Sequence, residues 1–117
     1  MVSKPRVPDT GHLVWLDFDP SAGREQAGRR PAIVLSPAAY NRKTSLALVA
    51  PVTSHAKAYP FEVPLPASSK ITGVVLSDHL KSVDWHERHA EYAGTAPADV
   101  VDEIRRKLAA LLGFDRG

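Results

Sequence analysis

Residues 12–18 read HLVWLDF, and after a polar segment residues 31–35 read PAIVL. Both runs are rich in aliphatic, β-branched and aromatic residues, and the first closes at Asp19-Pro20, so each is predicted to form a strand. The second run is apolar without interruption, which is typical of a strand buried on both faces. The segment between them, residues 21–30, is polar and contains two glycines, and it is predicted to be a loop.

Further short apolar runs follow along the chain. Pro60, Pro64 and Pro66 cannot donate to a strand ladder, so the run that they interrupt should lie at an edge of the sheet or end quickly. Five short strands within about 70 residues favour a β-barrel or a β-sandwich. The remaining predicted elements are strands at residues 45–52, 61–65 and 73–76, a continuation of the sheet at residues 83–85, and a connection with one helical turn at residues 37–43.

In the last part of the chain the spacing of the apolar residues changes. Apolar residues recur every three or four positions while charged residues fill the opposite face, which predicts an amphipathic helix at residues 97–113. Pro97 suits its first turn, Asp99 suits its positive N-terminal end, and Gly113 suits its end. The apolar positions are Val101, Ile104, Leu108 and Leu111.

The composition bounds the kind of protein. The chain has 117 residues, 44% of them hydrophobic and 24% charged, which suits a single domain spanning residues 1–117 with residues 1–8 as a flexible N-terminal segment. It has no cysteine, which excludes disulfides, thiolate metal sites and thiol nucleophiles. No apolar run resembles a signal peptide or approaches the roughly 20 residues of a membrane span, so we expect a soluble, cytoplasmic protein.

The loop at residues 23–30 reads GREQAGRR and holds three arginines and one glutamate. Arginine presents a planar fork of donors that matches phosphate oxygens, and glycine lets the backbone approach a ligand closely. The formal net charge is only +2, so this local clustering says more about a polyanionic partner than the total charge does. The loop lacks the Lys-Ser/Thr pair of a nucleotide-binding P-loop. It is a candidate phosphate-binding site, although a hairpin loop with internal Glu–Arg pairing explains the same residues.

Other polar residues give weaker signals. Thr53 and Ser54 end the predicted third strand, a rigid place from which to present a hydroxyl, but ordinary turn chemistry explains them by itself. His86 and His89 have no third ligand at a diagnostic spacing, so no metal site is predicted. We expect the two tryptophans, at positions 15 and 85, in the core or at a dimer interface rather than stacked on bases.

A series of sequence blocks resembles one known family. Residues 14–20 read VWLDFDP and residues 30–36 read RPAIVLS, with Gly23, Glu25-Gln26 and Gly28 between them. The blocks that follow in the family's order are Tyr40-Asn41, PVT at 51–53, Lys57, YPFEV at 59–63 and DHLKS at 78–82. From about residue 7 to its end, the chain resembles the MazF branch of the MazF/PemK toxin family.

The resemblance implies a fold, an activity and partners. The expected fold is mainly β with a C-terminal α-helix, a small SH3-like β-barrel of the MazF/CcdB type that works as a homodimer. The expected activity is sequence-specific cleavage of single-stranded RNA or mRNA without a metal or any other cofactor, which leaves a 2′,3′-cyclic phosphate and a 5′-hydroxyl. A MazE-like antitoxin is expected to block the RNA groove with an acidic segment, and their complex to bind its own operator DNA.

Residue roles carry over position by position. Arg30 matches the family's catalytic arginine, Thr53 its partnering threonine, and Glu25 an acidic residue proposed to assist proton transfer. RNA supplies its own nucleophile, the ribose 2′-hydroxyl, so proton transfer and cationic donors for the developing charge suffice. The expected RNA contacts are Arg24, Gln26, Gly28, Arg29, Lys57, Tyr59, Phe61, Asp78, Lys81 and Ser82.

The chain also departs from the family's other branch. Arg24 and Leu76 stand where some plasmid-borne relatives carry a histidine and an arginine of their acid/base set, so the mechanism should follow the MazF branch. Asp78 matches an aspartate of that other branch, and His12 replaces a frequent acidic residue. Two alternative functions stay open: a catalytically silent RNA-binding barrel, and a gyrase-poisoning toxin of the same fold. The second class uses aromatic and small residues at its extreme C-terminus, where this chain reads FDRG.

Overall fold

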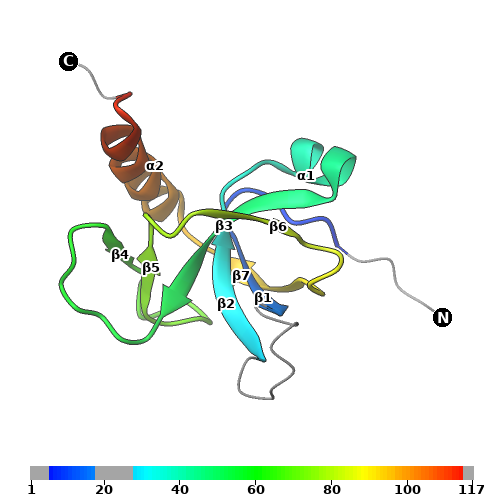
Figure 1. Cartoon of the computed structure of the whole chain (residues 1–117). Helices are drawn as coiled ribbons and strands as arrows, with labels where there is room; N and C mark the ends of the chain where they lie inside the picture. Colours follow the sequence, from blue (N-terminus) through cyan, green and yellow to red (C-terminus); the bar gives the residue numbers. More distant parts are fainter. Residues whose placement is uncertain (1–5, 18–27, 115–117) are drawn as a thin grey trace.

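The computed structural model describes residues 6–17 and 28–114 (Figure 1). In this part of the chain, strands make up most of the regular structure, and one long helix follows them. The strands are β1 (His12–Asp17), β2 (Arg29–Val34), β3 (Leu46–Thr53), β4 (Glu62–Pro64), β5 (Val74–Leu76), β6 (Lys81–Asp84) and β7 (Glu91–Thr95). The helices are α1 (Ala38–Thr44) and α2 (Ala98–Leu112).

The strands form one antiparallel sheet in the order β4-β5-β3-β2-β1-β7, with β6 paired to β3. The long strand β3 pairs with β6 along its first half and with β5 at its last two residues, so it links both parts of the sheet. Among the described residues β4 and β7 end the strand order and do not pair with each other, so the sheet is open. The prediction of a mainly β fold with a C-terminal helix is confirmed, and a closed barrel is supported only loosely.

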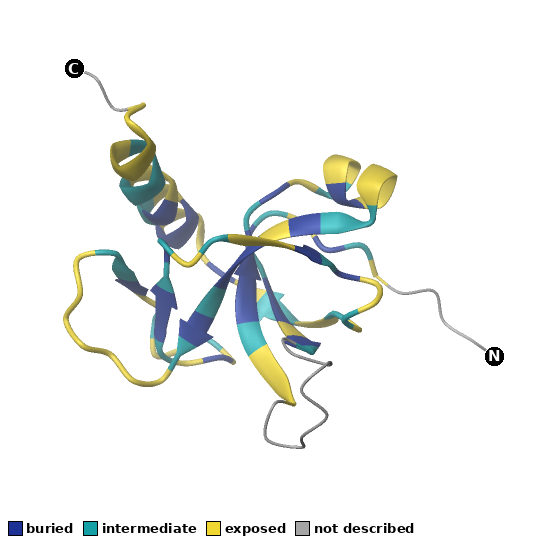
Figure 2. Ribbon diagram, viewed as in Figure 1, coloured by how far each residue is buried: buried dark blue, intermediate teal, exposed yellow. Residues whose placement is uncertain are grey.

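Apolar residues fill both sides of the sheet. Successive residues of a strand point to opposite faces, and β3 accordingly sends Ala47 and Val49 into one cluster and Ala50 and Val52 into another. The second of these clusters also receives α2, whose Ile104 is fully buried. Figure 2 shows that α2 is buried in the half nearest the sheet and exposed toward its C-terminal end.

The helix α2 confirms the predicted element at residues 97–113. Pro97 precedes its first residue, and Gly113 ends it in a left-handed conformation with φ 82°. The predicted apolar stripe is only partly buried, because Leu111 is 49% exposed. None of the helices in the described ranges is long and apolar enough to span a membrane.

Two elements differ from the sequence-based expectations. The connection predicted at residues 37–43 is the seven-residue helix α1, anchored by Asn41, whose buried amide bonds the carbonyls of Pro8 and Ser36. The strand β7 was not predicted, because it is an edge strand with no buried residue and therefore shows no apolar alternation. The strand interrupted by prolines, β4, lies at the other end of the sheet, as predicted.

The two tryptophans have different environments. Trp85 is buried and donates its indole N–H to the Asn41 carbonyl oxygen over 2.9 Å, which confirms a core position. Trp15 lies on β1 with 36% of its surface exposed. A core position is therefore not supported for Trp15, whereas a position at a dimer interface stays a prediction, and the residue lines the pocket described next.

Candidate active site

Arg30 and Thr53 lie near the free ends of two neighbouring strands. Strands β2 and β3 pair Ile33 with Ala50 and Ala32 with Pro51, and the same register continued by two residues sets Arg30 opposite Thr53. Since Arg30 and Ala32 are two positions apart on one strand, their side chains point to the same face. The paired stretch ends at Ala32 and Pro51, and beyond it the two strands border an open pocket.

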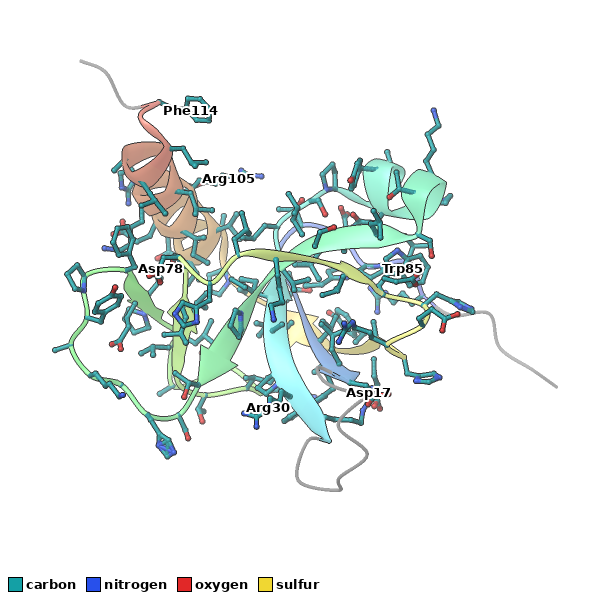
Figure 3. All side chains as sticks on the ribbon, in the orientation of Figure 1. Asp17, Arg30, Asp78, Trp85, Arg105 and Phe114 are labelled. Atoms are coloured by element: carbon teal, nitrogen blue, oxygen red, sulfur yellow. The ribbon has the colours of Figure 1, made fainter. Side chains whose placement is uncertain are left out.

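This pocket, the Arg30 pocket, has a volume of about 490 Å³. Its described lining includes Arg29, Arg30, Thr53, Trp15, His55 and Lys70, so it combines cationic side chains with a hydroxyl and an aromatic ring. Figure 3 shows Arg30 near the tip of β2. A pocket with this lining suits a phosphate ester, because Arg30 and Lys70 supply positive charge and the indole supplies an apolar surface.

The position of Thr53 is set by its neighbours. Its hydroxyl oxygen accepts a hydrogen bond from the backbone N–H of His55 over 3.1 Å. On the other side, Gly73 approaches so closely that a Cβ atom there would lie 2.2 Å from the Thr53 carbonyl oxygen. Gly73 also has φ +123°, a backbone conformation that residues with a side chain rarely adopt. Only glycine therefore fits this position without moving Thr53.

Arg29, predicted to contact RNA, has its guanidinium group occupied within the protein. It donates to Asp17 Oδ1 over 2.9 Å, to the carbonyl oxygens of Trp15 and His89, and to Glu91 Oε1 over 3.4 Å. Asp17 and Arg29 are directly opposite in the β1–β2 pairing, so this is a cross-strand ion pair. The contact of Arg29 with RNA stays a prediction, and its hydrogen bonds within the protein give Arg29 a structural role.

Asp17 is the centre of this cluster, which we call the Asp17 clamp (Asp17, Arg29, Arg88 and His89). His89 Nδ1 lies 2.8 Å from Asp17 Oδ2, and Arg88 donates to the Asp17 carbonyl oxygen over 3.0 Å. The hydrogen bond with His89, followed by that from Arg29, lowers the pKa of the Asp17 carboxyl below its usual value. The clamp ties the turn between β6 and β7 to the hairpin end that carries Arg30, with Asp17 and Arg30 on opposite sides of β2 (Figure 3).

A second pocket of about 450 Å³, the Tyr59 pocket, shares Thr53 and His55 with the Arg30 pocket. It brings together two of the predicted RNA contacts, Lys57 and Tyr59. The carboxylate of Glu62 accepts the backbone N–H of Lys57 over 2.9 Å and so holds this loop against β4. The ring of Phe61 lies 6.1 Å from that of Tyr59, which is 49% exposed. The two pockets therefore meet at Thr53 and His55, and together we call them the depression across the end of β3.

The remaining predicted residues are placed elsewhere or lie outside the described residues. Glu25, Arg24 and Gln26 belong to the latter group, while Gly28 is exposed just before β2. Lys81 and Ser82 pair with the first half of β3 and are not among the described residues that line either pocket. Asp78 also lines neither pocket, and its Oδ1 is buried without a hydrogen bond in the described part of the chain.

Sequence reasoning missed His55, Lys70 and the Asp17 clamp. His55 could have been noticed, because it follows Thr53 by two positions. Lys70 gave no signal, and His89 was weighed only with His86 as a metal pair, because each residue is brought to the site by pairing of segments far apart in the sequence. Within residues 6–17 and 28–114, no group of three or more histidine, aspartate or glutamate side chains is arranged to hold a metal ion.

The chain is similar to proteins that have been characterised. A family model described as PemK-like, MazF-like toxin of type II toxin-antitoxin systems matches residues 9–112. The chain is 48% identical over 113 residues to the endoribonuclease toxin MazF of Escherichia coli (strain K12), which covers 97% of this chain and 100% of the relative. It is 38% identical over 117 residues to the endoribonuclease toxin ChpB of the same strain, covering 96% of this chain and 99% of the relative.

Solved structures give the same picture. The crystal structure of MazF (Form-I) from Deinococcus radiodurans matches with a TM-score of 0.84 and 63% identity, covering 92% of this chain and 98% of that one. The crystal structure of MazE-MazF (Form-II) from the same organism matches with a TM-score of 0.85 and 57% identity, covering 94% and 99% of the two chains. The similarity thus extends over nearly the whole chain, including β2, β3 and the pocket between them.

Proposed function

Because this chain belongs to the PemK-like, MazF-like toxin family of type II toxin–antitoxin systems, we propose that the Arg30 pocket is the place where it cuts RNA. The protein is an endoribonuclease toxin. The observation that carries the assignment of the site is the meeting of Arg30 and Thr53, which resemblance marks as catalytic, in one cationic pocket. They come from two strands 23 positions apart in the sequence, so their convergence supports a shared task.

The cleavage follows from the chemistry of RNA. The ribose 2′-hydroxyl attacks the adjacent phosphorus, the bond to the 5′-oxygen breaks, and the products are a 2′,3′-cyclic phosphate and a 5′-hydroxyl. Negative charge builds on the phosphoryl oxygens during this step. The Arg30 guanidinium stabilises that charge, and the Thr53 hydroxyl, held by the His55 backbone, orients the phosphate beside it. Glu25 assists proton transfer, and no metal takes part.

The substrate is single-stranded RNA or mRNA. The depression across the end of β3 is open, and its cationic side chains Arg30, Lys57 and Lys70 follow a path along which a phosphate backbone can run. Trp15 and Tyr59 expose ring surface at two points of this path, and exposed aromatic rings stack well on unpaired bases. A duplex would keep its bases stacked inside and leave these rings without partners.

The same reasoning extends to assembly and control. A MazE-like antitoxin inhibits the enzyme by laying an acidic segment into this cationic depression, and the matching MazE-MazF structure makes such a partner a natural expectation. The active form is a homodimer of single-domain protomers with a small SH3-like barrel fold. It acts in the cytoplasm, where mRNA is found, and the toxin–antitoxin complex binds its own operator DNA.

One experiment tests the assignment of function. Purified protein is incubated with a long RNA in the presence of EDTA, and the cut ends are mapped and analysed chemically. We expect cuts at a short recurring sequence, with cyclic phosphate at one end and a 5′-hydroxyl at the other. If the folded protein binds the RNA but does not cleave it, the result would contradict the proposal and favour a catalytically silent RNA-binding protein.

A further inference from the structure

Residues 57–61, which we call the Pro60 loop, carry three of the predicted RNA contacts: Lys57, Tyr59 and Phe61. Two of these, Lys57 and Tyr59, line the Tyr59 pocket. A loop that is already ordered loses little conformational entropy when RNA binds, whereas a mobile loop must be ordered at the expense of affinity. The contacts that fix the Pro60 loop therefore bear on RNA binding.

The Pro60 loop contains a residue in an unfavourable backbone conformation. Ala58 has φ 57°, in the left-handed region that residues with a Cβ atom rarely adopt. Such a conformation persists where the surrounding contacts hold it. The Glu62 carboxylate accepts the Lys57 N–H over 2.9 Å, and the Glu62 N–H is donated to the Tyr59 carbonyl oxygen over 3.0 Å. These two bonds tie the loop to the start of β4.

A third anchor comes from the C-terminal helix. Lys107 of α2 donates from Nζ to the Pro60 carbonyl oxygen over 2.8 Å, although the two residues are 47 positions apart. The same ammonium group lies 3.4 Å from Glu103 Oε2, one helical turn earlier. The side chain of Lys107 is 26% exposed and that of its neighbour Arg106 68%, so Lys107 lies against the protein rather than in solvent. Because α2 packs against β4, a rigid helix backs the loop (Figure 1).

We propose that Lys107 is a positioning residue for RNA binding, which holds the Pro60 loop in the conformation that presents Tyr59 to an unpaired base; this rests on the endoribonuclease function proposed above. Lys107 acts through the main chain of Pro60 and not by contact with the RNA. Its loss leaves the Pro60 carbonyl oxygen to water and lets Ala58 relax toward a more favourable backbone conformation. Arg30 and Thr53 are held by β2 and β3 and keep their places.

The test compares the wild type with Lys107→Met and Arg105→Met. Methionine keeps most of the length and the helix propensity of lysine but has no N–H to donate. Arg105 also lies on α2 (Figure 3), is exposed, and its side chain makes no hydrogen bond or ion pair with the described residues. Arg105→Met therefore controls for the loss of one positive charge from the same helix.

We expect an effect on binding and not on turnover. Lys107→Met should bind an RNA analogue with a 2′-deoxy ribose at the scissile position about 10-fold more weakly than the wild type, while kcat at saturating RNA stays within about 2-fold. Arg105→Met should change both quantities by less than about 2-fold at physiological salt, which screens distant surface charges. A role of Lys107 in general stability alone would not separate the two quantities in this way.

Hydrogen exchange in the free protein tests the anchor without RNA. The Lys57 N–H is bonded to Glu62, so its exchange rate reports how often the Pro60 loop opens. This amide should exchange about 10-fold faster in Lys107→Met than in the wild type or in Arg105→Met. The amides of β3 should keep their rates, which excludes a general loss of stability as the cause.

A double-mutant cycle identifies the residue through which Lys107 acts. If Lys107 presents Tyr59 to the RNA, the 10-fold loss of affinity should shrink to about 2-fold or less when Lys107→Met is made in a Tyr59→Ala protein. If the loss keeps its full size there, Lys107 attracts the RNA by its charge and the proposal is wrong.

The other contradicting results separate this inference from the proposed function. A folded wild-type protein that does not cut RNA contradicts the endoribonuclease function and this inference together. If the wild type cuts RNA and Lys107→Met binds the analogue as tightly as the wild type does, the role of Lys107 alone is refuted. An unchanged exchange rate of the Lys57 N–H in Lys107→Met has the same meaning, because the loop would then keep its conformation without the anchor.

Discussion

Gly73 offers the sharpest structural test of how Thr53 is positioned. A Cβ atom at Gly73 would lie 2.2 Å from the Thr53 carbonyl oxygen, whereas ordinary contacts begin near 3.4 Å. Gly73→Ala must therefore either push the end of β3 away by about 1 Å or move away from its own position just before β5. Either movement would displace Thr53, because Thr53 pairs with Val74, the residue after Gly73.

Two costs add up in this variant. A residue with a side chain at φ +123° is strained by about 1–3 kcal/mol, and the clash with the neighbouring strand adds a similar amount. We expect the free energy of unfolding to fall by about 2–6 kcal/mol, a large part of the typical 5–15 kcal/mol of a small protein. Displacement of a catalytic group by about 1 Å lowers rates by about 100-fold, so kcat should fall to a similar extent in the protein that remains folded.

The matched control is Gly94→Ala. Gly94 also has a positive φ, +136°, but its nearest neighbour would be a flexible Lys70 side-chain carbon at 4.0 Å. This variant should therefore lose stability through backbone strain alone and keep nearly normal kcat. Urea unfolding measures the stabilities, and RNA cleavage at saturating substrate measures kcat. Equal effects of the two substitutions on cleavage would refute the idea that Gly73 positions Thr53.

Three further predictions concern the same site. Thr53→Val should lower kcat by about 10-fold or more with little change in stability, because it removes the hydroxyl and keeps the shape, and unchanged turnover would argue against a role for that hydroxyl. The pKa of Asp17 is lowered in the folded state, so the stabilisation from its carboxylate is present above the unfolded-state pKa near 3.8 and is lost as the pH falls through the folded-state pKa. Between pH 6 and pH 2 the free energy of unfolding should therefore fall less for Asp17→Asn than for the wild type. An acidic antitoxin peptide and RNA should exclude each other in a binding competition that weakens with salt, and a stable ternary complex at the Arg30 pocket would contradict this.

The sequence allowed much of the fold to be predicted. Apolar runs and turn residues located β1 to β5 to within a few positions, and helical periodicity located α2, since these elements bury a continuous face. The strand β7 was not predicted, because an exposed edge strand needs no apolar pattern and is held by main-chain hydrogen bonds to β1. Closure of a barrel could not be judged either, because strand order depends on pairing between distant segments rather than on any local run.

The candidate site was predicted in part. Arg30 and Thr53 were identified through resemblance, and the strand register explains why they meet. Arg29 looked equivalent to Arg30 in the sequence, and it also lines the Arg30 pocket, but its guanidinium is bonded to Asp17, which lies directly opposite on β1. No local pattern could have revealed the contact of His89 with Asp17, which are 72 positions apart.

The central claim is that Arg30 stabilises the charge that develops during cleavage. The most direct test measures kcat and the affinity for a 2′-deoxy substrate analogue in the wild type, Arg30→Ala and Arg30→Lys. Loss of one well-placed donor costs about 100- to 1000-fold in rate, roughly 3–4 kcal/mol. We predict such a loss of kcat for Arg30→Ala with a much smaller loss of affinity, and strong impairment of Arg30→Lys, which keeps the charge but not the planar fork. If Arg30→Ala turns over near the wild-type rate once RNA is saturating, Arg30 only binds phosphate and the account of the site is wrong.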